Sequence, residues 1–340
     1  MSEIKGRNQK LLDKVVESKK MENIAQWVGI DVSKATLDVY IRPMGKAFSV
    51  ANTEVEISHL VEELKSANLN LIVLEATGGL ETELVIQLQA AFLPVALINP
   101  RQGRDFAKAT GKLAKTDAID AKILAHFGEA MKPQRLPIES ETARQLSELI
   151  SRRRQLVEMQ TAEKNRRSRA RGKALADIEA HIEYLEQRLK QLNQEIEELT
   201  QNNQQWIDKI NLLKTTPGIG QVISTTLVSD LPELGKLTAK QISRLVGVAP
   251  INHDSGQHKG KRMINGGRAH VRATLYMGAV VAMRHNPVIK AFYERLVERG
   301  KSKKLALTAC VHKMLVILNA MVRDNLPWCI SDNFQPIVNA

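Results

Sequence analysis

The chain has 340 residues, 43% of them hydrophobic, which is enough for about two or three domains with apolar cores. Its formal net charge of +12 favours a polyanionic partner such as nucleic acid. With only two cysteines, no C-x-x-C pair and a polar N-terminus, the sequence excludes a disulfide framework, a zinc finger and a signal peptide. Because no uninterrupted apolar run approaches the roughly 18 residues of a membrane span, we expect a cytoplasmic protein without a membrane anchor.

The first part of the chain alternates apolar strands with helices. Strands are predicted at residues 27–30, 37–41, 48–50, 71–74 and 95–98, and helices at residues 55–65 and 81–91. This order of elements predicts an α/β domain over about residues 23–132. Residues 1–22 are polar and charged, and we expect them to form a flexible leader.

Four acids occupy characteristic positions in this α/β pattern. Asp31 follows the first strand, Glu75 ends the run at residues 71–74, and Asp117 and Asp120 open a helical stretch. A carboxylate at the end of a buried strand is costly unless a cation compensates it. Helical residues three apart share a face, and four oxygen donors without a nearby cysteine suit Mg²⁺ or Mn²⁺.

Each acid also has an ordinary interpretation. Asp31 could be a turn residue, Glu75 could pair with a Lys or Arg, and Asp117 could be a first-turn acid favoured by the helix dipole. The combination is more specific than its members. An acid-bearing strand, a hairpin, a helix, a strand that ends in Glu and a late D-x-x-D helix resemble a ribonuclease-H-like fold of the RuvC kind.

A long helical region follows a linker marked by Pro133 and Pro137. Its apolar residues alternate spacings of three and four, which is a heptad seam. The seam consists of Leu175, Ile178, Ile182, Leu185, Leu189, Leu192, Ile196 and Leu199, with Trp206, Ile210 and Leu213 in phase. Asn203 takes an in-phase position, where a polar residue can fix register. The seam predicts a self-associating coiled coil that makes a homo-oligomer, either a dimer or a tetramer. The alternative is a helical hairpin packed on its own domain.

A basic segment precedes the seam. Residues 152–173 carry nine Lys or Arg and two acids. The nine are Arg152, Arg153, Arg154, Lys164, Arg166, Arg167, Arg169, Arg171 and Lys173. Such a run is often only a solvated face, but the imbalance favours a surface that follows phosphates. Because aromatic residues make up only 4% of the chain, phosphate contacts should matter more than base stacking.

The C-terminal part combines a helical turn with a basic glycine-rich segment. Thr215-Thr216-Pro217-Gly218-Ile219-Gly220 predicts a helix-hairpin-helix element, in which backbone N–H groups at the start of a helix can face a phosphate. Residues 249–268 predict a flexible loop that contains Ser255. Its cations, with one just beyond it, are Lys259, Lys261, Arg262, Arg268 and Arg272.

Two interpretations of Ser255 are possible. Asp-Ser-Gly alone is ordinary turn chemistry. A hydroxyl in basic surroundings could also attack a phosphodiester, because the cations would stabilise the added negative charge. Helices at residues 270–283 and 305–321 should complete an apolar core.

Five ordered motifs together resemble the DEDD transposases of the insertion sequence 110 family. They are G-I-D-V-S-K, L-E-A-T-G, K-T-D-x-x-D-A, T-x-P-G-I-G, and G-x-A-P followed by D-S-G and K-R-x-x-x-G-G-R. The resemblance implies that Asp31, Glu75, Asp117 and Asp120 bind metal and that Ser255 is the recombinase nucleophile. It also implies donor DNA, target DNA and a structured noncoding guide RNA, the bridge RNA, as partners in a bacterial cytoplasm.

The resulting prediction is an α/β domain joined to all-α parts. The RuvC-like domain spans residues 23–132, linker and long helices span 133–213, a C-terminal transposase domain with the serine loop spans 214–330, and a tail spans 331–340. A continuous helix over residues 175–213 would be about 57 Å long, so acids and serine from different subunits could form one site. The alternatives are a RuvC-type junction resolvase or nuclease that uses water, and a non-catalytic nucleic-acid scaffold.

Overall fold

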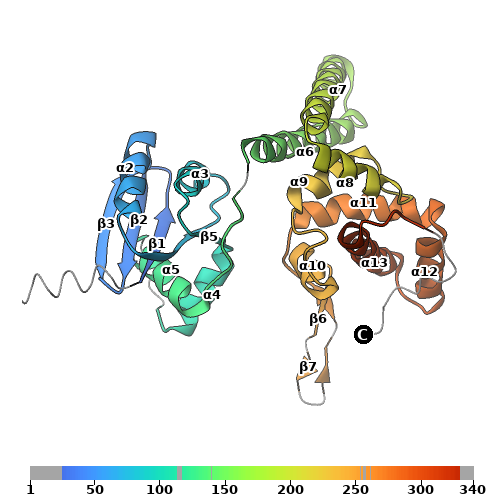
Figure 1. Cartoon of the computed structure of the whole chain (residues 1–340). Helices are drawn as coiled ribbons and strands as arrows, with labels where there is room; N and C mark the ends of the chain where they lie inside the picture. The colour runs from blue at the N-terminus through green and yellow to red at the C-terminus, as the bar shows by residue number, and fades with distance from the viewer. Residues whose placement is uncertain are drawn as a thin grey trace, which may run out of the picture. The chain divides into compact units, whose positions relative to one another are not determined.

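The structure is a computed structural model of the chain, and it describes residues 25–112, 117–138, 140–252, 254–255, 258–260 and 262–329. The predicted leader, the tail at residues 331–340 and the start of the K-T-D-x-x-D-A motif lie outside these residues. The chain forms two compact units, residues 1–138 and 139–340 (Figure 1). The finer division into domains stays a prediction.

The first unit is built on a mixed sheet of five strands with the order β3-β2-β1-β4-β5. The strands are β1 (Gln26–Val32), β2 (Thr36–Arg42), β3 (Lys46–Ala51), β4 (Leu69–Glu75) and β5 (Val95–Ile98). β1, β2 and β3 form an antiparallel meander, whereas β4 pairs parallel with both β1 and β5. This order, with its helical crossovers, is the ribonuclease-H-like arrangement that the sequence predicts.

Helices cover both faces of this sheet and make two separate cores. α2 (Glu54–Lys65) and α3 (Thr82–Ala90) pack on the face that carries Val28, Ile30 and Leu74. α5 (Asp117–Met131) packs on the opposite face, where Val73 meets Leu124, and α4 (Pro100–Ala109) contacts α5. Side chains alternate along a strand, so odd-numbered residues of β1 and β4 face α5.

The second unit begins with two long helices that form an antiparallel hairpin. α6 (Glu141–Arg167) and α7 (Gly172–Gln201) are joined by four residues and pack along their length. Leu146, Ile150 and Leu156 of α6 form one apolar cluster with Leu185 and Leu192 of α7. The leucine seam of α7 is therefore buried against its own chain, which is the alternative that the sequence left open.

The continuous helix predicted over residues 175–213 is wrong. α7 ends at Gln201, and the side chain of Asn203 caps α8 (Gln204–Lys214) by accepting a hydrogen bond from the Trp206 N–H. Asn203 is thus an N-cap between two helices, not a polar position within a seam. The length of an unbroken rod no longer argues for a site completed by a partner subunit, and self-association stays an untested prediction.

The rest of the second unit is a helical core. It contains α8, α9 (Gln221–Asp230), α10 (Ala239–Val246), α11 (Ala269–His285), α12 (Pro287–Glu298) and α13 (Lys303–Asp324). α8 and α9 enclose the predicted Pro-Gly turn. Gly218 has φ +103 and lies so close to α11 that an added Cβ would be 2.7 Å from the Ala282 Cβ. Glycine at this position is therefore required by packing as well as by backbone conformation.

α13 is long and apolar enough to cross a membrane by composition alone, and it is the one described helix that passes this test. Many of its apolar residues are buried in the core of the second unit. Cys310, Met314, Leu315 and Leu318 are at most 1% exposed in the core of the second unit. This helix therefore gives no support for membrane insertion.

The predicted glycine-rich loop is a short two-stranded arm. β6 (Pro250–Ile251) pairs with β9 (Met263–Ile264), and β7 (Asp254–Ser255) pairs with β8 (His258–Lys259). The labelled strands β6 and β7 extend away from the helices of this unit (Figure 1). Two residues separate β7 from β8, so the Ser255 backbone belongs to the last pair of the ladder, with His258 as its partner.

Candidate active site

Asp31 and Glu75 come from neighbouring strands at the same level of the sheet. Ile30 of β1 pairs with Leu74 of β4 in parallel register, so the next residues on the two strands are Asp31 and Glu75. Asp31 lies two residues after Gly29, and Glu75 lies two residues after Val73. Because side chains alternate along a strand, both acids lie on the face that Gly29 and Val73 present to α5. The two half-buried carboxylates therefore belong to one face of the sheet.

Asp120 is brought to the same face by a close approach of α5 to β1. A Cβ added to Gly29 would lie 2.1 Å from the Ala121 carbonyl oxygen and 2.4 Å from the Ala125 nitrogen. Only a residue without a side chain permits this helix-to-strand contact. Asp120 directly precedes Ala121, so the contact holds its backbone beside the strand that carries Asp31. Gly29, two residues before Asp31 in the G-I-D signature, is thus a structural requirement of the site.

A further acid lies on this face that was not among the candidates predicted from the sequence. Asp38 of β2 is the direct antiparallel partner of Asp31, and paired residues point to the same side of a sheet. On the same strand, Tyr40 lies under the Lys122 ammonium of α5, with 5.3 Å between the nitrogen and the ring centroid. The hairpin register, with a turn at residues 33–35, is the sequence signal that could have found Asp38.

The Glu75 side chain rests against α4. A Cβ added to Gly103 would lie 2.1 Å from the Glu75 Oε1, so glycine makes room for this carboxylate. The loop after Glu75 is shaped by Glu81, which accepts hydrogen bonds from the Thr77 hydroxyl at 2.6 Å and the Gly79 N–H at 2.9 Å. Burial alone would raise the pKa of Glu81, but these hydrogen bonds outweigh it and the pKa lies below its usual value.

The donor set on this face fits a hard divalent cation. Asp31, Glu75 and Asp120 supply carboxylate oxygens, which Mg²⁺ and Mn²⁺ prefer. Asp117 is the first residue of α5, but its side chain lies outside the described residues. Among the side chains that the structure does describe, no three His, Cys, Asp or Glu are grouped closely enough to hold a metal ion. A metal-binding role for the four acids therefore stays a prediction.

We expect Gly103→Ala to lower activity while it leaves stability unchanged or slightly raised. The new methyl group would displace the Glu75 carboxylate, the mobile end of a side chain, while alanine favours the helix by about 1 kcal/mol over glycine. Two quantities are measured for the variant and the wild type: the rate of DNA cleavage and the thermal unfolding midpoint. Full activity with the helix intact would show that the observed position of Glu75 does not matter.

The arm that carries Ser255 is held at its base by two glycines and an arginine. Gly247 and Gly267 have φ +77 and +69 and lie back to back, since a Cβ on Gly267 would be 2.3 Å from the Gly247 nitrogen. Arg272 Nη1 donates hydrogen bonds to the carbonyl oxygens of Val246 at 2.9 Å and Gly266 at 2.8 Å. The Ser255 side chain lies outside the described residues.

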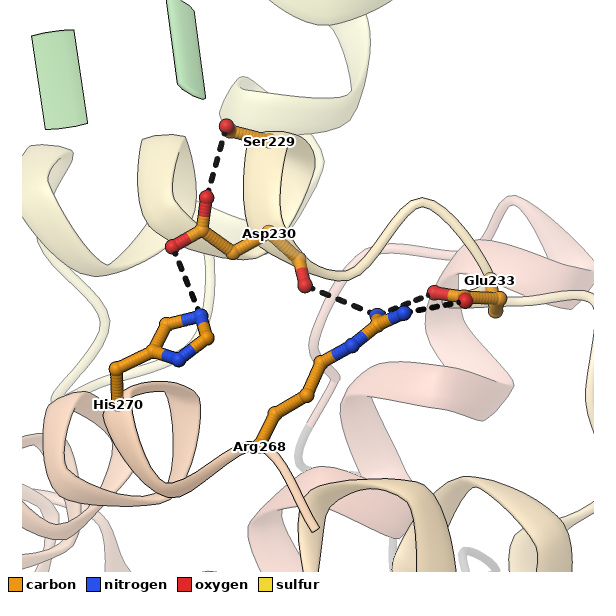
Figure 2. Close-up of polar contacts among 5 residues, drawn as sticks. All are labelled: Ser229, Asp230, Glu233, Arg268 and His270. Carbon is orange, nitrogen blue, oxygen red and sulfur yellow. Dashed lines mark hydrogen bonds and ion pairs between the residues drawn. The ribbon is translucent and has the colours of Figure 1, made fainter. Parts of the chain in front are cut away.

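A polar network fixes the start of α11 next to this base. Figure 2 shows Arg268 in a two-pronged ion pair with Glu233, with nitrogen-to-oxygen distances of 2.6 and 2.7 Å. Arg268 also donates to the Asp230 carbonyl oxygen, and the Asp230 carboxylate contacts His270 at 3.2 Å and accepts from Ser229. Burial would raise the pKa of Glu233, but the Arg268 hydrogen bonds and charge hold it below its usual value.

These contacts engage two of the predicted nucleic-acid residues. The guanidinium groups of Arg268 and Arg272 donate to groups at the base of the arm, and their predicted contact with nucleic acid stays a prediction. Arg262 is exposed on the arm. The Lys259 side chain and the whole of Lys261 lie outside the described residues, and their contact with phosphate stays a prediction.

Several predicted cations of the helical hairpin have partners within it. Arg153 donates to Asn193 at 2.7 Å across the hairpin, and burial lowers its pKa. Lys164 pairs with Glu186, and Arg166 pairs with Glu163. The remaining residues are Arg152, which donates to Gln155, Arg171, which donates to the Ala170 carbonyl, and the exposed Arg154, Arg167, Arg169 and Lys173. The net field of this segment is weaker than its composition suggests.

Comparison with known families decides the assignment. A DEDD transposase profile of the IS110 family matches residues 28–170, which include all four acids. A second profile, described as Transposase IS116/IS110/IS902 family, matches residues 210–294, which include Ser255. The chain belongs to the IS110 family of transposases. As a member of the IS110 family it is an enzyme of DNA recombination.

Relatives of this IS110 transposase include proteins of similar length. It is 26% identical over 312 residues to the pilin gene-inverting proteins of Moraxella bovis and Moraxella lacunata, covering 89% of this chain and 97% of each relative. An uncharacterised 43.6 kDa protein of insertion element IS110 from Streptomyces coelicolor is 26% identical over 33% of this chain and 28% of its own length. One solved structure, titled T. thermophilus RuvC in complex with Holliday junction substrate, has 15% identity to this chain and a TM-score of 0.27, covering 33% of this chain and 100% of that one.

Proposed function

We propose that this IS110 transposase cuts and rejoins donor and target DNA through a covalent phosphoserine link at Ser255, with Mg²⁺ or Mn²⁺ held by its acids. The observation that carries the proposal is the shared face of Asp31, Glu75 and Asp120, produced by the β1–β4 register and the approach of α5 to Gly29. Asp117, one helical turn before Asp120, would complete the set.

The acids would act by binding and orientation. Asp31, Glu75, Asp117 and Asp120 would hold the ion, and the packing of α4 and α5 on the sheet would fix their backbone positions. A bound divalent ion can polarise the scissile phosphate and lower the pKa of an attacking hydroxyl. Asp38 would add negative charge beside Asp31 and so favour a cation on this face.

Ser255 would supply the attacking oxygen. In the proposed step its Oγ bonds to the phosphorus, the bond from phosphorus to a deoxyribose oxygen breaks, and the serine proton ends on that leaving oxygen. Attack by the hydroxyl of a second strand then restores a phosphodiester and frees the serine. Because one phosphate ester replaces another at each step, strand exchange needs no external energy source.

Choice of DNA by a guide RNA is the part of the proposal that rests on family resemblance alone. The IS110-type motifs imply a structured noncoding RNA that pairs with donor and target DNA. The relatives named for pilin gene inversion support a reaction in which strands are cut and rejoined. The net charge of +12 supports partners with phosphate backbones in the bacterial cytoplasm. A foldable untranslated sequence beside the gene, with loops that match both DNA sites, would test the RNA.

The alternative is a RuvC-type nuclease in which water attacks and Ser255 has no chemical role. The two reactions differ in whether DNA becomes joined to the protein. We expect wild-type protein, denatured during the reaction, to show a protein–DNA adduct that Ser255→Ala lacks. The matched control is Ser168→Ala, which removes an exposed hydroxyl from the same unit and should still form the adduct. An adduct that persists in Ser255→Ala would place the nucleophile elsewhere.

A further inference from the structure

The turn that joins α12 to α13 carries an excess of positive charge that belongs to none of the family motifs. Residues 295–313 contain six Lys or Arg and one acid, Glu298. The six cations are Arg295, Arg299, Lys301, Lys303, Lys304 and Lys313, and together they are named the α12–α13 basic surface. Its charge density is comparable to that of residues 152–173, where nine cations accompany two acids.

The cations of the α12–α13 basic surface are not neutralised by acids. Five of the six are exposed, and Lys313 is half-buried. Within the residues that the structure describes, all ion pairs of Lys and Arg lie elsewhere, the last on the chain being Arg323 with Asp324. In the helical hairpin, by contrast, Lys164 and Arg166 pair with acids. The α12–α13 basic surface therefore presents six positive charges, none of which is paired with an acid among the described residues.

An aromatic ring gathers two of these cations at one point. The Lys313 nitrogen lies 4.6 Å and the Arg295 guanidinium carbon 5.3 Å from the centroid of the Phe292 ring. Burial and then the charge of Arg295 lower the pKa of Lys313. The cation–π contacts offset part of the repulsion between the two charges, and an anion that contacts both would offset more.

The partner that fits this arrangement is the backbone of a duplex. Arg295, Lys303, Lys304 and Lys313 belong to two packed helices, and Arg299 and Lys301 lie in the turn between them. Single-strand binding, by contrast, generally adds stacking of bases on free aromatic rings. Here Phe292 is half-buried and occupied by cations, and Tyr293 packs against the core. Contacts restricted to phosphates give affinity without sequence preference.

We propose that the α12–α13 basic surface binds the sugar–phosphate backbone of duplex DNA next to the recombination site. The inference rests on membership of a DNA transposase family and is independent of the serine chemistry. Such a contact would hold the DNA against the same helical core from which the arm carrying Ser255 extends.

The test removes four exposed charges from the turn and the start of α13 in the full-length protein: Arg299→Gln, Lys301→Gln, Lys303→Gln and Lys304→Gln. Ser302 stays, because its side chain caps α13. Binding of a DNA duplex of unrelated sequence is measured in EDTA at several salt concentrations. We expect the Kd to rise at least about tenfold near 0.1 M salt and the slope of log K against log salt to fall by about 2 to 4.

The matched control keeps every charge: Arg299→Lys, Lys301→Arg, Lys303→Arg and Lys304→Arg should leave both Kd and slope unchanged. Circular dichroism and the unfolding midpoint verify the fold of both variants. An unchanged Kd and slope in the neutral variant would overturn the proposal. A loss of affinity for duplex RNA but not for duplex DNA would overturn the choice of DNA. Because EDTA prevents metal-dependent cleavage, either result is separate from the fate of the Ser255 mechanism.

Discussion

Asp31→Asn is expected to lower DNA cleavage at least about a thousandfold while DNA binding stays within a few-fold of wild type. The substitution keeps the size of the side chain but removes a charge from the face shared with Glu75 and Asp120. In the proposed mechanism Asp31 is a metal ligand, and its loss would remove several kcal/mol of transition-state stabilisation. The measurements are single-turnover cleavage in Mg²⁺ and equilibrium binding of the same DNA in EDTA.

The control for Asp31→Asn is Asp105→Asn. Asp105 is an exposed acid of α4 that lies 3.7 Å from Arg101 on the same helix. This variant should cleave at the wild-type rate, because exposed pairs of this kind contribute little. Equal losses in both variants, or normal cleavage by Asp31→Asn, would rule out the proposed role of the shared face.

Gly29→Ala is expected to destabilise the first unit by about 2 to 3 kcal/mol and to abolish cleavage. The added methyl group would overlap backbone atoms of Ala121 and Ala125, and backbone cannot move aside as a side-chain end can. α5 would have to shift away from β1, and Asp120 would move with it. Thermal unfolding should show an earlier first transition, and hydrogen exchange should show lower protection in α5.

The control for Gly29→Ala is Gly103→Ala, a substitution of the same kind in the same unit. There the added Cβ meets only the carboxylate end of Glu75 and the tip of Ile98, so activity should fall without a loss of stability. If Gly29→Ala were as stable as wild type, the close approach of α5 to β1 would not be what fixes the site.

Most of the first unit could be predicted from the sequence because its strands are short, apolar and separated by turn residues. β5 has the predicted bounds, and α2 starts one residue before its prediction. The acids could be placed at strand ends, but Asp38 required the register across the hairpin. The roles of Gly29 and Gly103 could not be predicted from the sequence. They depend on tertiary contacts, of Gly29 with α5 and of Gly103 in α4 with Glu75.

The second unit shows where patterns leave alternatives open. Spacings of three and four predict an apolar stripe but not its partner, and here α6 covers the stripe of α7. Asn203 fits either a seam or a helix cap until the backbone is known. Charge counting did not distinguish Arg268, which is paired with Glu233, from Lys303, which has no paired acid within the described residues. The strands β7 and β8 of the arm have two residues each, which is too short to show the alternation of apolar and polar residues that predicts a strand.

In the proposed reaction a protein hydroxyl, and not water, attacks the DNA. Recombination with wild-type protein in water enriched in ¹⁸O, followed by mass spectrometry of the recombined strands, distinguishes the two attacking groups. Serine attack conserves the phosphate ester, so the account predicts rejoined phosphodiesters without solvent oxygen and without a requirement for ATP. A solvent ¹⁸O atom in the phosphate at the cleaved position, formed at the rate of cleavage, would contradict the account and establish a water-using nuclease.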